Sequence, residues 1–167
     1  LLYSGNDNAV AIADHIAGST EKFAEMMNAE AKKLMATNSH FVNPSGLHDD
    51  NHYTTAYDLY LIFNECIKHD EFVKIINSSS YTAHITGADG TKRDVKWEPT
   101  NYYAKGEATP PDNVTLIGGK TGTTKGAGNC LILLTKDSSG NPYISIIMGA
   151  GSKPLLYQDM TSMLSKI

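Results

Sequence analysis

The residues with the clearest chemical potential are Lys120, Thr121 and Gly122, in the stretch GGKTGTTKGAGN. Gly-Lys-Thr also ends a Walker A phosphate loop, so nucleotide binding is one function to consider. The complete loop needs a glycine where this chain has Val114, and it needs a helix that begins at the Lys-Thr pair. Three glycines and the apolar run NCLILLTKD follow that pair here, which predicts a strand. The sequence therefore does not predict a nucleotide site.

A second short motif, Ser4-Gly5-Asn6, lies just before a segment with helical periodicity. Taken alone, Ser-x-Asn ahead of a helix is typical of a helix cap, and Lys-Thr-Gly is typical of a polar strand end. Acyl transfer to serine needs a nucleophile, a base, a proton relay to the leaving group and donors for the developing oxyanion. In this order and with this separation, the two motifs match serine acyl-transferases that recognise penicillin.

The elements that would position these motifs form a helical half followed by a strand half. Helical spacing of apolar residues predicts five helices, over about 7–17, 19–34, 55–66, 70–77 and 154–167. Alternation of side-chain type predicts a hairpin and two later strands, over 81–86, 91–97, 130–137 and 143–150. Helices first and an antiparallel meander afterwards indicate an α+β fold.

The bulk composition narrows the class of protein. The 167 residues are enough for one domain, and 41% hydrophobic with 19% charged residues is ordinary for a soluble globular protein. The net charge of −4 gives no general reason to expect nucleic acid or an anionic membrane as a partner. No apolar run is long enough to span a membrane. Cys66 and Cys130 lack metal-ligand spacing, which favours buried free thiols over a disulfide.

The match extends beyond the two motifs to SGNDNAVAIADHIAGS, FAEMMNAEAKKL, SHFVNPSGLHDDNHYTTAYDL and GGKTGTTKGAGNCLI. Together these segments resemble the low-molecular-weight D-alanyl-D-alanine carboxypeptidases, peptidase family S11. The resemblance covers nearly the whole chain and is strongest over 4–60 and 114–150. It implies a β-lactamase/transpeptidase-like α+β fold. It is expected to have three parts. Residues 1–80 form a helical part, residues 81–110 a hairpin with a connection, and residues 111–167 the sheet strands with a final helix.

The resemblance implies a role in acyl transfer for each motif. Ser4 would relay protons between a lysine base and the leaving amine. Asn6 would hold the amide of the substrate and help to position that lysine. Lys120 would pair with the terminal carboxylate of a D-Ala-D-Ala peptide or of a penicillin. No metal and no organic cofactor is implied.

Three further positions beside the lysine complete the implied substrate site. The Thr121 hydroxyl would donate to the same carboxylate, and Gly122 would let substrate lie along the strand without a side-chain clash. The N–H of Thr123 would be one oxyanion donor. Many relatives have histidine at that position, so any role of the Thr123 side chain stays open.

The nucleophile of this family lies in a Ser-x-x-Lys motif upstream of Ser-x-Asn, where this chain shows none. Its single Ser-x-x-Lys, at 19–22, follows Ser4 and is interpreted as an N-cap serine with a solvated lysine. The copy of the second motif at 139–141 is expected to be a hairpin turn. The run HDDNH at 48–52 is expected to be a polar turn and not a metal site.

The resemblance predicts the C-terminal portion of a D,D-carboxypeptidase catalytic domain, exported to the cell envelope. Its parent would remove terminal D-Ala from peptidoglycan stem peptides through an acyl-serine intermediate, and it would bind β-lactams. This chain alone would be inactive because it lacks the nucleophile. The alternatives are a β-lactamase-related hydrolase and a non-catalytic binding or structural module of the same fold.

We expect three of the five sheet strands that are usual in the family. The strand over 143–150 would then have an open edge, and the helices at 7–34 and the last helix would lose the face against which they pack. The start at Leu1, without an initiator Met, is interpreted as a sign that a longer protein has been cut. The expected partner is a missing N-terminal segment or a second copy of the chain.

Overall fold

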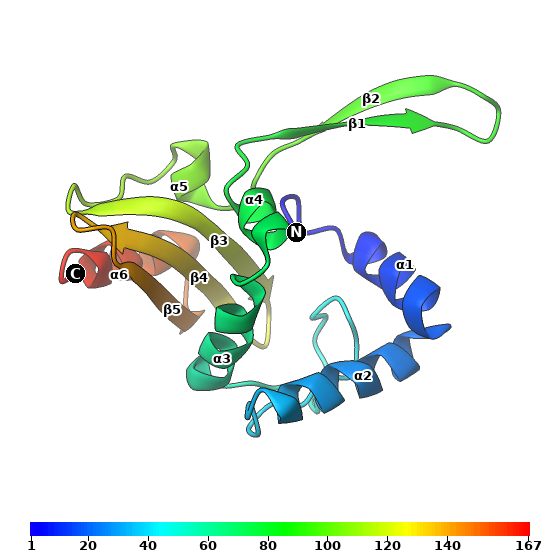
Figure 1. The fold of residues 1–167 in the computed structure, drawn as a ribbon, viewed down its shortest axis with the longest axis horizontal. Coiled ribbons are helices and arrows are strands. Elements are labelled where there is room, and N and C mark those ends of the chain that lie inside the picture. Colours follow the sequence, from blue (N-terminus) through cyan, green and yellow to red (C-terminus); the bar gives the residue numbers. More distant parts are fainter.

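The computed structural model describes residues 1–167 and has an α+β fold, as the sequence predicts (Figure 1). The first elements are α1 (Asn6–Ala17), α2 (Thr20–Lys33), α3 (Ala56–Cys66) and α4 (Asp70–Ile76). The later elements are β1 (Tyr81–Thr86), β2 (Lys92–Trp97), α5 (Tyr102–Lys105), β3 (Val114–Thr124), β4 (Gly128–Asp137), β5 (Pro142–Ala150) and α6 (Lys153–Leu164). The sequence prediction missed α5, because four residues are too few to show a helical period. None of the helices has the length and apolar character needed to cross a bilayer.

Helix boundaries follow local cap chemistry. Ser19, Thr55 and Ser152 precede α2, α3 and α6, and each side-chain oxygen accepts a hydrogen bond from the backbone N–H three residues on. Gly18 ends α1 in the left-handed conformation, at φ 79°. The predicted N-cap function of Ser19 is therefore confirmed.

The main sheet has three antiparallel strands in the order β3-β4-β5. Its central strand, β4, carries apolar side chains on both faces. Leu131 and Leu133 pack with α6, whereas Leu134 packs with Phe63 of α3 and Ile76 of α4. The sheet is therefore covered by α6 on one face and by α3 and α4 on the other (Figure 1).

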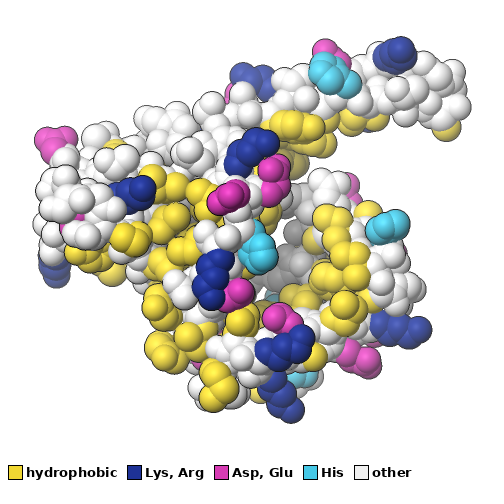
Figure 2. Space-filling model, viewed as in Figure 1, with side chains coloured by type: hydrophobic (Ala, Val, Ile, Leu, Met, Phe, Trp, Pro, Cys, Tyr) yellow, Lys and Arg dark blue, Asp and Glu magenta, His cyan; other side chains and the backbone are white.

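The last helix keeps its packing surface, so the expectation that it would lose one is wrong. Leu156, Met160 and Leu164 of α6 are buried in the core that this helix shares with the sheet, because the strands it covers belong to this chain. For α1, the sequence expectation is supported. Its Ile12 and Ile16 side chains are each 56% exposed. In Figure 2, hydrophobic side chains lie along α1 and, across a hollow, over the region of α3 and the sheet.

The β1–β2 hairpin extends away from the rest of the molecule (Figure 1). Its pairing runs from Tyr81 opposite Trp97 to Thr86 opposite Lys92, as the sequence predicts for a hairpin. The two aromatic rings at its base stack with centroids 6.2 Å apart. The base of the hairpin lies beside the region before α1, and both line one cavity.

Candidate functional site

Ser4 and Lys120 meet although 116 residues separate them in the sequence. Lys120 lies in the middle of β3, opposite Ile132 of β4, and Ser4 lies just before α1. The Lys120 Nζ donates a 2.7 Å hydrogen bond to the Ser4 Oγ. Ser4 has a left-handed backbone, at φ 63°, which is uncommon for a residue other than glycine. Such strain is concentrated at functional sites, and here it belongs to the turn that brings this hydroxyl to β3.

Lys120 is a partly buried cation whose hydrogen-bond partners are all uncharged. Its ammonium group donates to the Ser4 hydroxyl and, at 2.5 Å, to the carbonyl oxygen of Thr121. Burial lowers the pKa of the Lys120 ammonium group below its ordinary value, and no acidic group acts in the opposite direction. An anionic ligand group near this ammonium would stabilise its charged form and raise that pKa.

A cavity of about 260 Å³ opens beside the Ser4–Lys120 pair; we call it the central cavity. Its wall includes five of the six predicted site residues, which are Ser4, Asn6, Thr121, Gly122 and Thr123. Lys120 is not in the wall itself, but its ammonium group donates a hydrogen bond to the Ser4 hydroxyl, which is part of the wall. The structure therefore brings all six residues together, and Lys120 reaches the cavity through the hydroxyl group of Ser4.

The Thr121 hydroxyl has a partner from outside the predicted set. Its oxygen lies 2.6 Å from the hydroxyl oxygen of Thr100, which precedes α5 and also lines the central cavity. A hydroxyl that accepts a hydrogen bond from its neighbour keeps its own hydrogen for another acceptor. This pair can therefore present one hydrogen-bond donor to a ligand in the cavity.

The glycines on either side of Lys120 have different structural roles: Gly118 allows close packing of a helix, and Gly122 leaves space beside the strand. A Cβ at Gly118 would lie 2.1 Å from the carbonyl oxygen of Ile76, the last residue of α4. Gly118 therefore lets α4 pack directly on β3. At Gly122, an added Cβ would meet only the Cys130 Cβ, at 3.9 Å, so the strand has free space beside it there. Helix packing and an open strand face explain the glycine-rich sequence without a phosphate loop.

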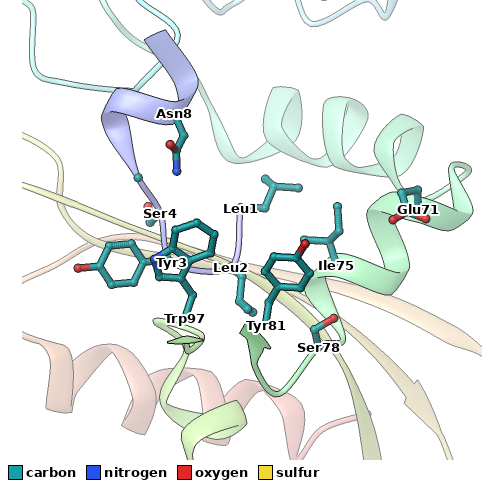
Figure 3. Close-up of a pocket in the computed structure, with 11 residues that line it drawn as sticks. Leu1, Leu2, Tyr3, Ser4, Asn8, Glu71, Ile75, Ser78, Tyr81 and Trp97 are labelled. Atoms are coloured by element: carbon teal, nitrogen blue, oxygen red, sulfur yellow. The ribbon is translucent and has the colours of Figure 1, made fainter. Parts of the chain in front are cut away.

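Ser4 also lines a second cavity, of about 330 Å³ (Figure 3). Tyr81 and Trp97, from the base of the hairpin, and Ile75 of α4 contribute apolar wall there. Glu71, on the same side as Ile75, gives the rim a carboxylate (Figure 3). Ser4 is thus accessible from two cavities, and the hairpin shapes one of them.

Two other sequence matches have the local structures that the sequence predicts. Ser19 uses its hydroxyl oxygen to cap α2, and the segment 139–141 forms the turn between β4 and β5, where Gly140 has φ 85°. The HDDNH run lies in the loop before α3. Within it, the Nδ1 atom of His52 accepts a hydrogen bond from the backbone N–H of Val42, and burial lowers the pKa of this imidazole.

Six residues of the central cavity were missed by the sequence reasoning: Thr100, Tyr102, Cys130, Lys153, Leu156 and Tyr157. Cys130, which was expected to be a buried thiol, is half-buried in the cavity wall. These residues lie on α5, β4 and α6 or just before them. Only the pairing of β4 with β3 and the packing of α6 on the sheet bring them to the motif residues, so no local pattern could have identified them.

Comparison with known proteins matches residues 1–152 to the family of D-alanyl-D-alanine carboxypeptidases, peptidase S11. The D-alanyl-D-alanine carboxypeptidase DacF of Bacillus subtilis is 31% identical over 98% of this chain. DacD of Escherichia coli is 34% identical over 91% of it. The chain spans 39% and 36% of the lengths of these two relatives.

Solved structures of the same kind of enzyme share the fold. The crystal structure of the Streptomyces K15 DD-transpeptidase matches with a TM-score of 0.88 and 28% identity, over 99% of this chain and 63% of that protein. A D-alanyl-D-alanine carboxypeptidase of Mycobacterium tuberculosis matches with a TM-score of 0.79 and 25% identity, over 60% of its chain. The predicted transpeptidase-like fold class is therefore confirmed.

Proposed function

Because the chain belongs to the D-alanyl-D-alanine carboxypeptidase family, we propose that it forms part of the active site of a serine-type enzyme acting on peptidoglycan stem peptides. The 2.7 Å hydrogen bond between Ser4 and Lys120, beside the central cavity, carries the proposal. In the reaction, a nucleophilic serine attacks the carbonyl carbon of the last peptide bond. D-Ala leaves as the free amine after gaining a proton, and water then hydrolyses the acyl-serine ester. A β-lactam would acylate the same serine.

Ser4 is suited to deliver the proton that the leaving amine needs. An ammonium group can only donate hydrogen bonds, so Lys120 occupies an acceptor position of the Ser4 Oγ and leaves the hydroxyl hydrogen free. The hydroxyl can then donate its hydrogen to the leaving nitrogen and regain one from the catalytic base. Asn6, in the same cavity wall, is the proposed partner of the substrate amide.

The carboxylate of the substrate would bind where Ser4 and Thr121 face the central cavity. The Thr121 hydroxyl supplies a neutral donor, and Lys120 supplies a positive charge that has no acidic partner in this structure. The free space beside Gly122 accommodates the ligand backbone along β3. The backbone N–H of Thr123 is the proposed oxyanion donor.

The nucleophile of this reaction is proposed to lie outside the 167 residues, in a Ser-x-x-Lys segment. Ser19 already serves as the cap of α2, and the chain spans only 39% of DacF. The hollow between α1 and the sheet, which has hydrophobic side chains on both sides, is the proposed site for such a segment, either covalently joined or separate (Figure 2). A second copy of the chain is the other proposed occupant. The chain alone would be inactive, and the enzyme would act outside the cytoplasm, where peptidoglycan lies.

A fluorescent penicillin tests this proposal. The chain alone should not be labelled, whereas a protein that continues upstream through a Ser-x-x-Lys segment should be labelled at that serine. Slow release of the label supports a carboxypeptidase, and fast turnover supports a β-lactamase-related hydrolase. Absence of labelling in the longer protein supports a non-catalytic module. Labelling of the isolated chain at Ser19 would contradict the proposed position of the nucleophile.

A further inference from the structure

A further cavity, different from the two that Ser4 lines, shares part of its wall with the central cavity and has an excess of basic residues. It measures about 420 Å³, and Lys96, Lys105 and Lys153 line it together with a single acidic residue, Glu98. Three residues line both this space and the central cavity: Thr100, Tyr102 and Lys153. We call this further cavity the lysine hollow. A ligand that fills the central cavity can therefore continue into the lysine hollow past these three side chains.

The ammonium groups of two of the three lysines lie over the Tyr102 ring. This ring stacks on the ring of Tyr157, a buried residue of α6, with centroids 4.6 Å apart and planes 6° apart. Tyr157 thus covers one face of the ring. The ammonium groups of Lys105 and Lys153 lie 5.7 Å and 5.5 Å from the Tyr102 centroid, within the range of cation–π attraction. Two positive charges are therefore gathered at one aromatic ring whose orientation is fixed by the core.

The three lysines differ in how far their charges are already compensated. Lys96 pairs with Glu98 at 3.3 Å, and Lys105 pairs with Glu107. Lys153 forms no ion pair, and the uncharged Tyr102 ring is its partner. An ammonium group without an acidic partner, beside two other lysines, favours an anion at this point.

We propose that the lysine hollow binds an anionic oxygen group, a carboxylate or a phosphate, on the part of a ligand that extends beyond the central cavity. Lys153 provides the uncompensated charge, and Lys96 and Lys105 add to the local positive potential. The existence of this anion site does not depend on the proposed function, whereas its connection to a peptidoglycan ligand does.

Calorimetric titration of the chain with two probes tests this inference. The probes are inorganic phosphate and an acetylated peptide with a C-terminal carboxylate, both at low ionic strength because salt screens exposed charges. Lys153→Met keeps the length of the side chain and removes its charge, so it should weaken binding of the preferred probe about tenfold or more. The control is Lys68→Met, which removes an exposed lysine that follows α3 and pairs with Glu65, and it should leave binding unchanged.

The two probes and a further variant distinguish the outcomes. Preference for phosphate or for the carboxylate peptide, with loss in Lys153→Met and retention in Lys120→Met, supports the site and identifies the anion, whereas equal loss in both variants would place the anion in the central cavity and overturn the inference. Binding that is lost in Lys120→Met and retained in Lys153→Met would overturn the inference while supporting the proposed function. Absence of binding of either probe by the parent chain at millimolar concentration would also overturn it. Circular dichroism of each variant shows whether a loss reflects the site or the fold.

Discussion

The hydroxyl oxygens of Thr100 and Thr121 lie 2.6 Å apart, where the segment before α5 meets β3. Both residues line the central cavity. The contact restricts the Thr121 hydroxyl, the group proposed to donate to the carboxylate of the ligand. Thr100 would then act on the ligand through Thr121, as a positioning residue.

We predict that Thr100→Val slows acylation by a penicillin in a protein that joins this chain to a Ser-x-x-Lys segment. Valine keeps the shape of threonine and removes the hydroxyl, so the Thr121 hydroxyl loses its partner. A hydrogen bond between neutral groups contributes about 0.5–1.5 kcal/mol, so the rate constant should fall roughly two- to tenfold. Thr100→Ser, which restores the hydroxyl, should recover most of the rate. Equal acylation rates for the valine variant and the parent would show that Thr100 does not position Thr121.

Lys120→Ala should have a larger effect in the same protein. It removes a charge-assisted interaction of about 1.5–3 kcal/mol with the carboxylate, and it also removes the donor that orients the Ser4 hydroxyl. Acylation by penicillin and by a D-Ala-D-Ala peptide should both fall more than tenfold. An alanine variant that acylates at the parental rate would show that Lys120 is not the carboxylate anchor.

The buried position of Lys120 also predicts a pH dependence of stability. Its pKa is lowered by burial in the folded chain, whereas the unfolded chain has the ordinary lysine value of about 10.4. Between the folded and the unfolded pKa the unfolded chain binds more protons, so the free energy of unfolding rises with pH across that window. Lys120→Met removes this contribution. As the pH is raised from 7 to 10, the urea midpoint of the parent should therefore increase relative to that of the variant. If the difference between the two midpoints stays constant over this range, Lys120 does not have a lowered pKa in the folded chain.

Gly118→Ala tests whether glycine is needed for the contact between α4 and β3. The new Cβ would lie 2.1 Å from the Ile76 carbonyl oxygen, a backbone atom that cannot move away without displacing α4. Overpacking of this kind costs about 1–3 kcal/mol, which urea unfolding would detect. Gly151→Ala is the matched control, because no atom lies within 4 Å of its added Cβ and its φ is not positive. An equal loss of stability in both variants would show that the contact between α4 and β3 does not require glycine at position 118.

The sequence predicts local features of this fold better than distant contacts. The caps at Ser19 and Thr55 and the hairpin depend on side chains a few residues apart, so their chemistry is visible in the sequence. The approach of Ser4 to Lys120 could be inferred from the family resemblance alone, since 116 residues separate them. The position of Lys153 in the cavity wall depends on how α6 packs on the sheet, and no local pattern contains that information.

Open apolar surfaces of the chain lie on α1 with α2 and on β5. Ile12, Ile16 and Met26 are at least half exposed on the first two helices. On the sheet, β5 is an outer strand, paired on one side only with β4. An unpaired strand edge is a template for pairing with another chain, and an exposed apolar helix face favours association.

We therefore predict that the purified chain is not a stable monomer. Light scattering should show dimers or larger species, or association with a separate N-terminal segment, and intact mass should identify the components. Ile12→Lys combined with Ile16→Lys should reduce self-association if the α1 face is responsible. If the double variant associates as the parent does, the β5 edge becomes the expected contact, and Met148→Lys on that strand should then reduce association. A cooperatively melting monomer of 18.1 kDa would show that neither surface needs a partner. It would also contradict the proposal that a further segment or a second copy occupies the hollow between α1 and the sheet.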